Sequence, residues 1–316
     1  MKKQTEPKKY LVSFDSHTSS HVFTDVLVIG SGVAGLSSAI QAAKHGSVLV
    51  VTKEKLDENN TAYAQGGIAV VLSERDTLLK HIKDTLDAGQ ELCDKATVKT
   101  IISEGPKRVR EMIDWGAAFD RKGGHLIFTQ EGGHSFPRII RAQGDSTGKA
   151  VEHTLISVSE KNKNIKAFEY TFVIDLITRD GVCHGAVTWH AKKGIVLIWA
   201  KRTILATGGC GQVYRETTNP DVATGDGLAM AYRAGAAFQD MEFVQFHPTT
   251  LYIAGAVRFL ITETVRGEGG ILRNKNGERF MPNYHPQAEL APRDVVSQSI
   301  LQEMQKTDHT NVYIDV

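Results

Sequence analysis

The feature that most constrains this sequence is a glycine-rich turn between an apolar run and a helix-forming stretch. Residues 23–29 are apolar and rich in β-branched side chains, and residues 30–35 read Gly-Ser-Gly-Val-Ala-Gly. Residues 33–44 favour a helix, and residues 47–52 form a second apolar run. A strand, a glycine turn, a helix and a second strand in this order predict the opening of a doubly wound parallel sheet.

The three glycines of this turn predict a site for the pyrophosphate of a dinucleotide. Gly30 permits a tight turn, Gly32 lets phosphate oxygens approach the backbone, and Gly35 lets the helix pack on the strand. The helix N-terminus adds partial positive charge for an anion. The alternative is a glycine turn without a ligand, and the strand–turn–helix context argues against it.

The end of the second strand departs from the usual dinucleotide pattern. An acidic residue there normally binds a ribose hydroxyl, whereas this chain has Lys53 followed by Glu54. Either Lys53 contacts the nucleotide itself, or another group binds the ribose. A second glycine turn at residues 206–209 and a small-residue patch at 61–67 favour a flavin over a nicotinamide dinucleotide, because an extended cofactor crosses several strand ends.

Other patterns indicate the remaining elements. Asp94 is a candidate N-cap for a long amphipathic helix. Residues 168–179 and 182–190 alternate on either side of an Asp-Gly turn and predict a hairpin. Residues 195–200 and 203–206 are read as two further strands.

The chain divides into three parts by composition. Residues 1–21 are polar and lysine-rich, without the apolar core of a signal peptide, and are predicted to be a mobile tail. Isolated polar clusters begin near residue 240. We therefore expect a dinucleotide-binding domain over residues 22–239 and a second domain over residues 240–316.

Charge and cysteine content exclude several classes of protein. The 37 Lys and Arg residues balance 36 Asp and Glu residues, so neither nucleic acid nor an anionic membrane is an expected partner. Cys93, Cys183 and Cys210 have no CxxC spacing, which argues against a zinc site and a disulfide framework. We expect no metal, no membrane span, and a location in the cytoplasm.

Eight motifs in order resemble the flavoprotein subunit of the fumarate reductase and succinate dehydrogenase superfamily, and within it the L-aspartate oxidase family. The resemblance covers residues 24–316, and its motifs lie at residues 30–35, 63–67, 131–135, 206–209, 225–227, 245–249, 266–269 and 290–294. It implies an α/β fold: a Rossmann-like FAD-binding domain, with a parallel sheet plus a β-meander, and an inserted α+β capping domain.

Two positions indicate the branch of this superfamily. The membrane-linked dehydrogenases attach flavin to a histidine where this chain has Asn60, so the resemblance implies noncovalent FAD. Glu131 opens a Glu-Gly-Gly-His-Ser segment similar to aspartate oxidases, and a carboxylate there suits a substrate with an α-ammonium group.

The resemblance also implies the ligands of each group. The residues implied for FAD are Gly30, Ser31, Gly32, Val33, Ala34, Gly35, Lys53, Asn60, Thr61, Ala62, Tyr63, Ala64, Gln65, Gly66, Gly67, Thr207, Gly208 and Asp226. Asp226 as a plain N-cap is the alternative for that residue.

For a dicarboxylic amino acid, the implied binding residues are Glu131, Gln245, His247 and Thr262, with Arg293 as the catalytic residue. We favour Arg293 as substrate anchor and electrostatic stabiliser first and proton shuttle second, because a guanidinium normally stays protonated. The alternative for Arg293 is a surface ion pair with Asp294 or Glu289. For Arg266 and Glu268, one interpretation is a structural ion pair that shapes the turn.

The implied activity is oxidation of L-aspartate to iminoaspartate, with hydride transfer from Cα to flavin and oxygen or fumarate as acceptor. This is the first step of quinolinate and NAD biosynthesis, which makes quinolinate synthase a possible partner. The alternatives are a soluble fumarate reductase or succinate dehydrogenase flavoprotein, with fumarate as ligand, and a flavin-binding fragment without turnover. Family members extend well beyond residue 316, so the resemblance implies that both domains are truncated.

Overall fold

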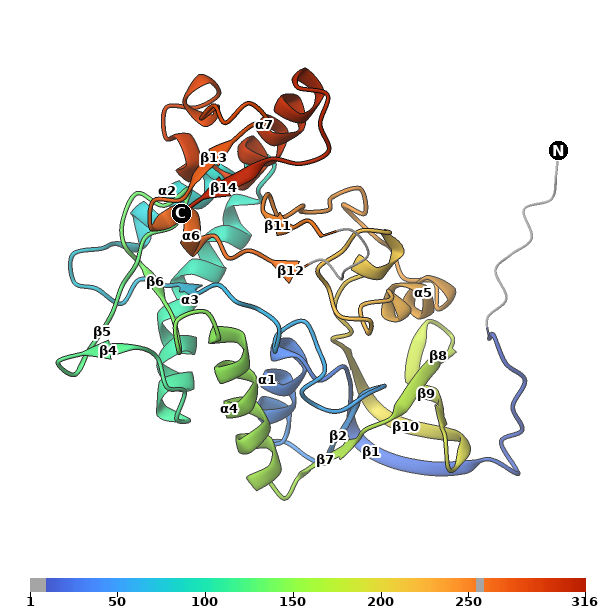
Figure 1. Cartoon of the computed structure of the whole chain (residues 1–316). Helices are drawn as coiled ribbons and strands as arrows, with labels where there is room; N and C mark the ends of the chain where they lie inside the picture. The colour runs from blue at the N-terminus through green and yellow to red at the C-terminus, as the bar shows by residue number, and fades with distance from the viewer. Residues whose placement is uncertain (1–9, 254–258) are drawn as a thin grey trace. The chain divides into compact units, whose positions relative to one another are not determined.

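The computed structural model describes residues 10–253 and 259–316 (Figure 1). Residues 1–9 of the predicted tail, and residues 254–258 of the predicted second domain, lie outside the described part. The chain splits into two compact units. Among the described residues, the sheet unit comprises residues 10–63 and 151–241, and the second unit comprises residues 64–150, 242–253 and 259–316.

The described elements follow in chain order. They are β1 (Ser20–Ile29), α1 (Val33–Ala42), β2 (Val48–Val51), β3 (Ile68–Ala69), α2 (Leu78–Ala88), α3 (Lys95–Asp114), β4 (Arg121–Lys122), β5 (His125–Leu126), β6 (Ile139–Ile140), α4 (Thr147–Lys161), β7 (Ile165–Phe168), β8 (Thr171–Arg179), β9 (Val182–His190), β10 (Gly194–Leu205), α5 (Asp226–Arg233), β11 (Thr250–Leu251), β12 (Phe259–Leu260), α6 (Thr264–Gly267), β13 (Ile271–Arg273), α7 (Arg293–Lys306) and β14 (Tyr313–Asp315). Short 3-10 turns lie at Gly211–Val213, Met281–Asn283 and Ala288–Leu290.

One sheet of six strands forms the sheet unit, in the order β7-β2-β1-β10-β9-β8. Strands β7, β2, β1 and β10 are parallel to their neighbours, whereas β10, β9 and β8 form an antiparallel meander. The curved ribbon of β1 and β10 beside the shorter β2 and β7 is visible in Figure 1. The expected parallel sheet plus β-meander is therefore confirmed as one mixed sheet.

Several strand boundaries differ from the sequence prediction. The strand predicted from residue 168 begins at Thr171 as β8, and Phe168 belongs to β7. β1 begins at Ser20, so residues 20 and 21 of the predicted tail are strand residues. The two strands predicted at 195–200 and 203–206 form one continuous strand, β10. The prediction of two separate strands was wrong because β1 pairs with β10 on both sides of exposed Lys201, through Thr24–Ala200 and Val26–Arg202.

Local signals account for several elements as predicted. The Asp94 side chain accepts a hydrogen bond from the Thr97 N–H and caps α3. Asp180 and Gly181 both have positive φ, 51° and 75°, between β8 and β9. Positive φ at both central residues gives a turn whose twist matches the flanking strands.

One buried apolar cluster of the sheet unit lies on the face that α5 covers. Alternate residues of the central strands, including Leu27, Leu49 and Ile198, pack with Met230 of α5 in one buried cluster. Helix α1 packs against β1 and β2. These contacts fix the strand ends from which the glycine turns emerge.

The second unit has its own apolar core. Leu272, Phe280, Met281, Ala291 and Val296 form a buried cluster there. Val296 lies on α7, so this core fixes the first turn of that helix, which carries Arg293. Within the described ranges, no helix is both long enough and apolar enough to cross a membrane.

Candidate functional site

A cavity of about 410 Å³ lies at the ends of the parallel strands in the sheet unit. β1 ends at Ile29, β2 at Val51 and β10 at Leu205, and all three residues line the cavity. Because these strands are parallel neighbours, their carboxyl ends meet at one edge of the sheet. This edge is where open α/β sheets bind ligands.

The glycine turn after β1 has the backbone geometry that the sequence predicted. Gly30 has a φ of 109°, and a Cβ there would lie 2.2 Å from the Ala206 carbonyl oxygen. A Cβ on Gly35 would lie 1.9 Å from the Gly30 carbonyl oxygen. Both positions therefore accept only glycine, because backbone atoms cannot move away as a side chain does.

The start of α1 fits a bound phosphate. Its N-cap, Gly32, makes no side-chain capping bond, and the first turn of the helix has no acidic residue. A Cβ on Gly208, at the second glycine turn, would meet only the Asn60 amide within 4 Å. Backbone is thus exposed to the cavity from both turns, and the N-terminus of the helix supplies N–H groups for an anion.

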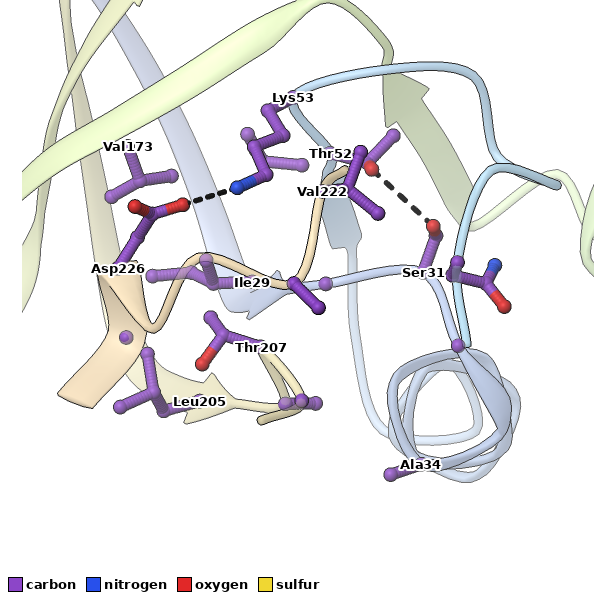
Figure 2. Close-up of a pocket in the computed structure, with 18 of the residues that line it drawn as sticks. Ile29, Ser31, Ala34, Thr52, Lys53, Val173, Leu205, Thr207, Val222 and Asp226 are labelled. Carbon is purple, nitrogen blue, oxygen red and sulfur yellow. Dashed lines mark hydrogen bonds and ion pairs between the residues drawn. The ribbon is translucent and has the colours of Figure 1, made fainter. Parts of the chain in front are cut away.

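Lys53 lies in the wall of this cavity with a defined partner (Figure 2). Its Nζ forms an ion pair with Asp226 and donates a hydrogen bond to Thr224 Oγ1 at 2.6 Å. Asp226 is the first residue of α5, and Gly225, not Asp226, is the N-cap. The plain N-cap reading of Asp226 is therefore wrong. Across the same cavity, Ser31 Oγ donates to Thr52 Oγ1 at 3.3 Å (Figure 2).

The residues predicted for the cofactor separate into three groups. Those that line the cavity are Gly30, Ser31, Gly32, Val33, Ala34, Lys53, Asn60, Thr61, Thr207, Gly208 and Asp226. Gly35, Ala62 and Tyr63 belong to the same unit without lining it. Residues 64–67 belong to the second unit, where a Cβ on Gly67 would lie 2.3 Å from the Ile139 side chain.

Arg293 anchors a cluster of charged groups in the second unit. Its Nε donates to Glu263 Oε2 at 2.6 Å, and its NH1 donates to Gln245 Oε1 at 3.3 Å. Glu263 is buried, whereas the Arg293 side chain is 36% exposed. Asp294 instead accepts a hydrogen bond from the Gln90 side chain, so the alternative of a surface ion pair between Arg293 and Asp294 is wrong.

Glu289 is not the partner of Arg293 either. It forms an ion pair with Arg279 at 2.6 Å. The sequence suggested an ion pair between Arg266 and Glu268. Among the described residues, the carboxylate that forms an ion pair with Arg266 is that of Glu263, whose Oε2 lies 3.7 Å from Arg266 NH2. Arg266 is fully buried, and its NH1 donates to the Glu289 carbonyl oxygen at 2.6 Å. Burial lowers the pKa of Arg266, and Glu263 opposes this shift.

Glu131 has a cationic partner that the sequence did not indicate. Arg141 NH2 donates to Glu131 Oε1 at 2.8 Å, and both side chains are mostly buried. The next residue, Gly132, donates its N–H to Glu263 Oε1 at 3.2 Å. One connected set of contacts therefore joins Arg141, Glu131, Glu263 and Arg293.

His247 and Thr262 are held by their own neighbours. His247 Nδ1 lies 2.8 Å from the Thr249 carbonyl oxygen. Burial, and then the charge of Arg293, lower the pKa of His247, so the imidazole is neutral at pH 7. Thr262 Oγ1 lies 3.1 Å from Thr264 Oγ1, immediately before the short helix α6.

Sequence reasoning missed Arg141 and gave no role to Glu263. Nothing in the spacing of Glu131 and Arg141 indicates a pair, because their contact depends on the turn between them. Glu263 had one available signal, its place beside Thr262. Groups of three or more His, Cys, Asp or Glu side chains arranged for a metal are absent from residues 10–253 and 259–316.

The fold is that of an α/β protein, and the cavity is a candidate dinucleotide site at the carboxyl edge of its parallel sheet. The model of the FAD binding domain family matches residues 25–316. This chain belongs to that family, and FAD is its cofactor.

Two groups of relatives refine this assignment. L-aspartate oxidase 2-b, chloroplastic, of Nicotiana tabacum is 49% identical over 93% of this chain and 47% of its own length. L-aspartate oxidase of Vibrio cholerae is 45% identical over 92% of this chain and 57% of its own length. This chain spans about half the length of the curated relatives it matches.

Solved structures give the same fold. An E. coli quinol fumarate reductase matches with a TM-score of 0.89 and 34% identity, over 94% of this chain and 54% of that chain. The open conformation of a flavocytochrome c3 fumarate reductase matches with a TM-score of 0.73 and 30% identity, over 90% and 52% of the two chains. The expected flavoprotein fold is confirmed.

Proposed function

We propose that this chain catalyses the FAD-dependent oxidation of L-aspartate to iminoaspartate, the first step of quinolinate and NAD biosynthesis. Relatives named L-aspartate oxidase, at 44–49% identity, support this activity. The structural observation that supports the proposal is the position of Glu131 next to Gly132, whose N–H donates to Glu263, while Glu263 in turn accepts from Arg293. It puts an acceptor for an ammonium and a donor for a carboxylate in one cluster.

Each group of this cluster has a proposed role toward the substrate. Arg141 engages Glu131 Oε1 and fixes its orientation, which leaves Oε2 to accept from the α-ammonium. Arg293, partly exposed and oriented by Glu263, binds a carboxylate. Neutral His247, with Gln245 and Thr262, is proposed to complete the substrate contacts.

Oxidation of L-aspartate to iminoaspartate requires removal of a hydride from its Cα. FAD, when bound, supplies the acceptor for that hydride, with oxygen or fumarate as final acceptor. The protein residues hold the substrate and keep its charges paired, so that Cα is presented in one orientation. The Glu263 carboxylate keeps the Arg293 guanidinium in a fixed position while substrate binds.

The cofactor is proposed to bind noncovalently. Asn60 lines the cavity at the position where the covalent branch has histidine, and an amide cannot form that linkage. We propose that residues 22–239 form the FAD-binding domain and that residues 240–316 belong to the capping domain.

Replacing Glu131 by glutamine tests the substrate assignment. A charge-assisted hydrogen bond contributes about 1.5–3 kcal/mol, so kcat/KM for L-aspartate should fall roughly 10–100-fold. Fumarate reduction by the reduced enzyme should be largely intact, because fumarate has no ammonium. Peroxide release from L-aspartate and fumarate-dependent flavin reoxidation measure the two activities.

Two controls sharpen this experiment. Glu131→Gln leaves Arg141 without its carboxylate, so the double variant with Arg141→Met separates that effect from the lost ammonium contact. Glu268→Gln, at an exposed glutamate, should leave both activities unchanged. Equal loss of both activities in the double variant contradicts the role of Glu131.

A soluble fumarate reductase or succinate dehydrogenase flavoprotein is the second candidate. The E. coli quinol fumarate reductase match, at 34% identity, favours it. Oxidation of succinate without oxidation of L-aspartate in parallel assays would establish it instead.

Location and partners are proposed on chemical grounds. All three cysteines are free thiols, which fits the reducing cytoplasm. Relatives from plants are named chloroplastic. An enzyme that consumes iminoaspartate, quinolinate synthase, is the proposed functional partner.

A further inference from the structure

A fully buried carboxyl group lies behind the cofactor cavity without a cationic partner. Glu152, in the first turns of α4, has no exposed surface. Its Oε1 accepts a hydrogen bond from Asn59 Nδ2 at 2.9 Å, and its Oε2 has no hydrogen-bond partner in the described part of the chain. Such a group is costly to ionise and is not explained by the substrate cluster.

Asn59 connects this carboxyl group to the cavity wall. Its Nδ2 also donates to the Leu56 carbonyl oxygen at 2.8 Å, and its Oδ1 accepts from the Ala62 N–H at 3.1 Å. One amide thus closes the loop of residues 56–62 on itself. Asn59 lines the cavity, whereas Glu152 does not reach it.

The same loop contacts the phosphate-binding end of α1. Thr61 Oγ1 accepts a hydrogen bond from the Val33 N–H, the first residue of the helix, at 3.0 Å. A Cβ on Gly32 would lie 3.1 Å from that Oγ1. The position of Thr61 therefore sets how much of the helix end faces the cavity.

We propose that Glu152 is a positioning residue for the FAD site, acting as a neutral acid that holds Asn59 and so keeps the 56–62 loop in place at the start of α1. It touches neither the cavity nor the cofactor directly. The inference rests on FAD as the family cofactor and is independent of the substrate proposed above.

The environment of Glu152 agrees with a neutral acid. Burial raises the pKa of Glu152 to about 7, the Asn59 hydrogen bond opposes this, and the charge of Asp57 adds to it. No lysine, arginine or histidine among the described residues forms an ion pair with Glu152. Ionisation above pH 7 would put an uncompensated negative charge behind the loop that contacts a phosphate site.

FAD affinity as a function of pH tests this role. FAD is titrated into FAD-free protein, without aspartate, and its fluorescence quenching gives Kd at pH 6 and pH 8.5. The unmodified chain should bind roughly tenfold more weakly at pH 8.5, since ionised Glu152 disturbs the loop. Glu152→Gln, which keeps the oxygen acceptor and cannot ionise, should hold Kd within about threefold across this range.

Two further variants complete the experiment. Glu152→Leu removes the acceptor for Asn59, and FAD should bind at least about tenfold more weakly at both pH values. Glu160→Gln, at an exposed position of α4, should keep the pH dependence of the unmodified chain. If Glu152→Leu does not fold, Glu152→Gln decides, because the pH profile of a purely structural residue would not flatten. An unchanged pH profile in Glu152→Gln, or no FAD binding by the unmodified chain, overturns the inference.

Discussion

Replacing Arg138 by methionine perturbs the most deeply buried charge of the second unit. The Arg138 side chain has no exposed surface. Its Nε and NH2 donate to the two carboxylate oxygens of Asp76 at 2.8 and 3.0 Å, and its NH1 contacts Asp84 and lies 3.2 Å from His134 Nδ1. One guanidinium therefore pairs with two buried carboxylates.

The expected loss follows from these contacts. Methionine replaces much of the aliphatic volume of arginine, so the main change is two buried carboxylates without a cation. Breaking a buried ion pair by removing one partner costs about 3–5 kcal/mol. Asp84 keeps the hydrogen bonds that it accepts from the N–H and Oγ of Ser135, each at 2.9 Å. Asp76 loses the bidentate contact, so we expect the free energy of unfolding to fall by about 3–5 kcal/mol at pH 7.

The loss should depend on pH with a defined sign. Burial raises the pKa of Asp76 and of Asp84, but their hydrogen bonds, Arg138 among the donors, lower both pKa values below the ordinary 3.8. In the unmodified chain this stabilisation is therefore present above pH 4 and lost in more acidic solution. Without Arg138 the burial effect dominates and both pKa values rise. The difference between variant and unmodified chain should then shrink between pH 7 and pH 4.5.

Urea denaturation followed by circular dichroism, with hydrogen exchange of α2, measures this difference at both pH values. Lys83→Met is the matched control. The Lys83–Asp87 ion pair lies on α2, the helix that carries Asp84, but it is exposed and should contribute less than about 1 kcal/mol to the free energy of unfolding. Adding Asp76→Asn and Asp84→Asn to Arg138→Met should restore part of the stability. A loss below about 1 kcal/mol, or one that is the same at pH 4.5, would refute the reasoning.

Three further predictions concern the sheet unit. Gly35→Ala should abolish FAD binding and lower the melting temperature, since its Cβ would lie 1.9 Å from a backbone oxygen; native-like binding by a calorimetric titration would contradict this. Lys53→Met should weaken FAD binding several-fold by leaving the Asp226 carboxylate without a cation in the cavity wall, and adding Asp226→Asn should recover it. Glu152 binds a proton up to a pKa of about 7 in the folded chain but only to about 4.5 when unfolded. The free energy of unfolding should therefore fall as pH rises from 4.5 to 7, and Glu152→Gln should remove that slope in urea titrations at several pH values.

Local chemistry made much of the fold predictable from the sequence. The glycine turn after β1, the Asp94 cap and the Asp-Gly turn between β8 and β9 each need particular residue types at neighbouring positions. Such requirements are readable in a linear pattern because all partners lie within a few residues.

Contacts between distant residues were not predictable in this way. Arg138 pairs with Asp76 from 62 positions away, and Arg293 with Glu263 from 30. The continuity of β10 through Lys201 depends on pairing with β1, not on its own hydropathy. Glu152 gave no signal at all, because a glutamate in a helical stretch normally faces water. In each case the deciding partner lies on another element.

The charge of the proposed substrate cluster, taken together with buried Arg266, whose NH2 lies 3.7 Å from Glu263, bears on the choice between an amino acid and a simple dicarboxylate. Arg141, Arg266 and Arg293 with Glu131 and Glu263 give one net positive charge, since His247 is neutral at pH 7. L-aspartate brings one net negative charge, which balances it, whereas succinate brings two. Glu131→Gln raises the cluster to two positive charges and removes the acceptor for the ammonium. The same substitution that weakens aspartate oxidation should therefore bring binding of succinate and fumarate closer to that of aspartate, because electrostatic complementarity acts on the difference between ligands.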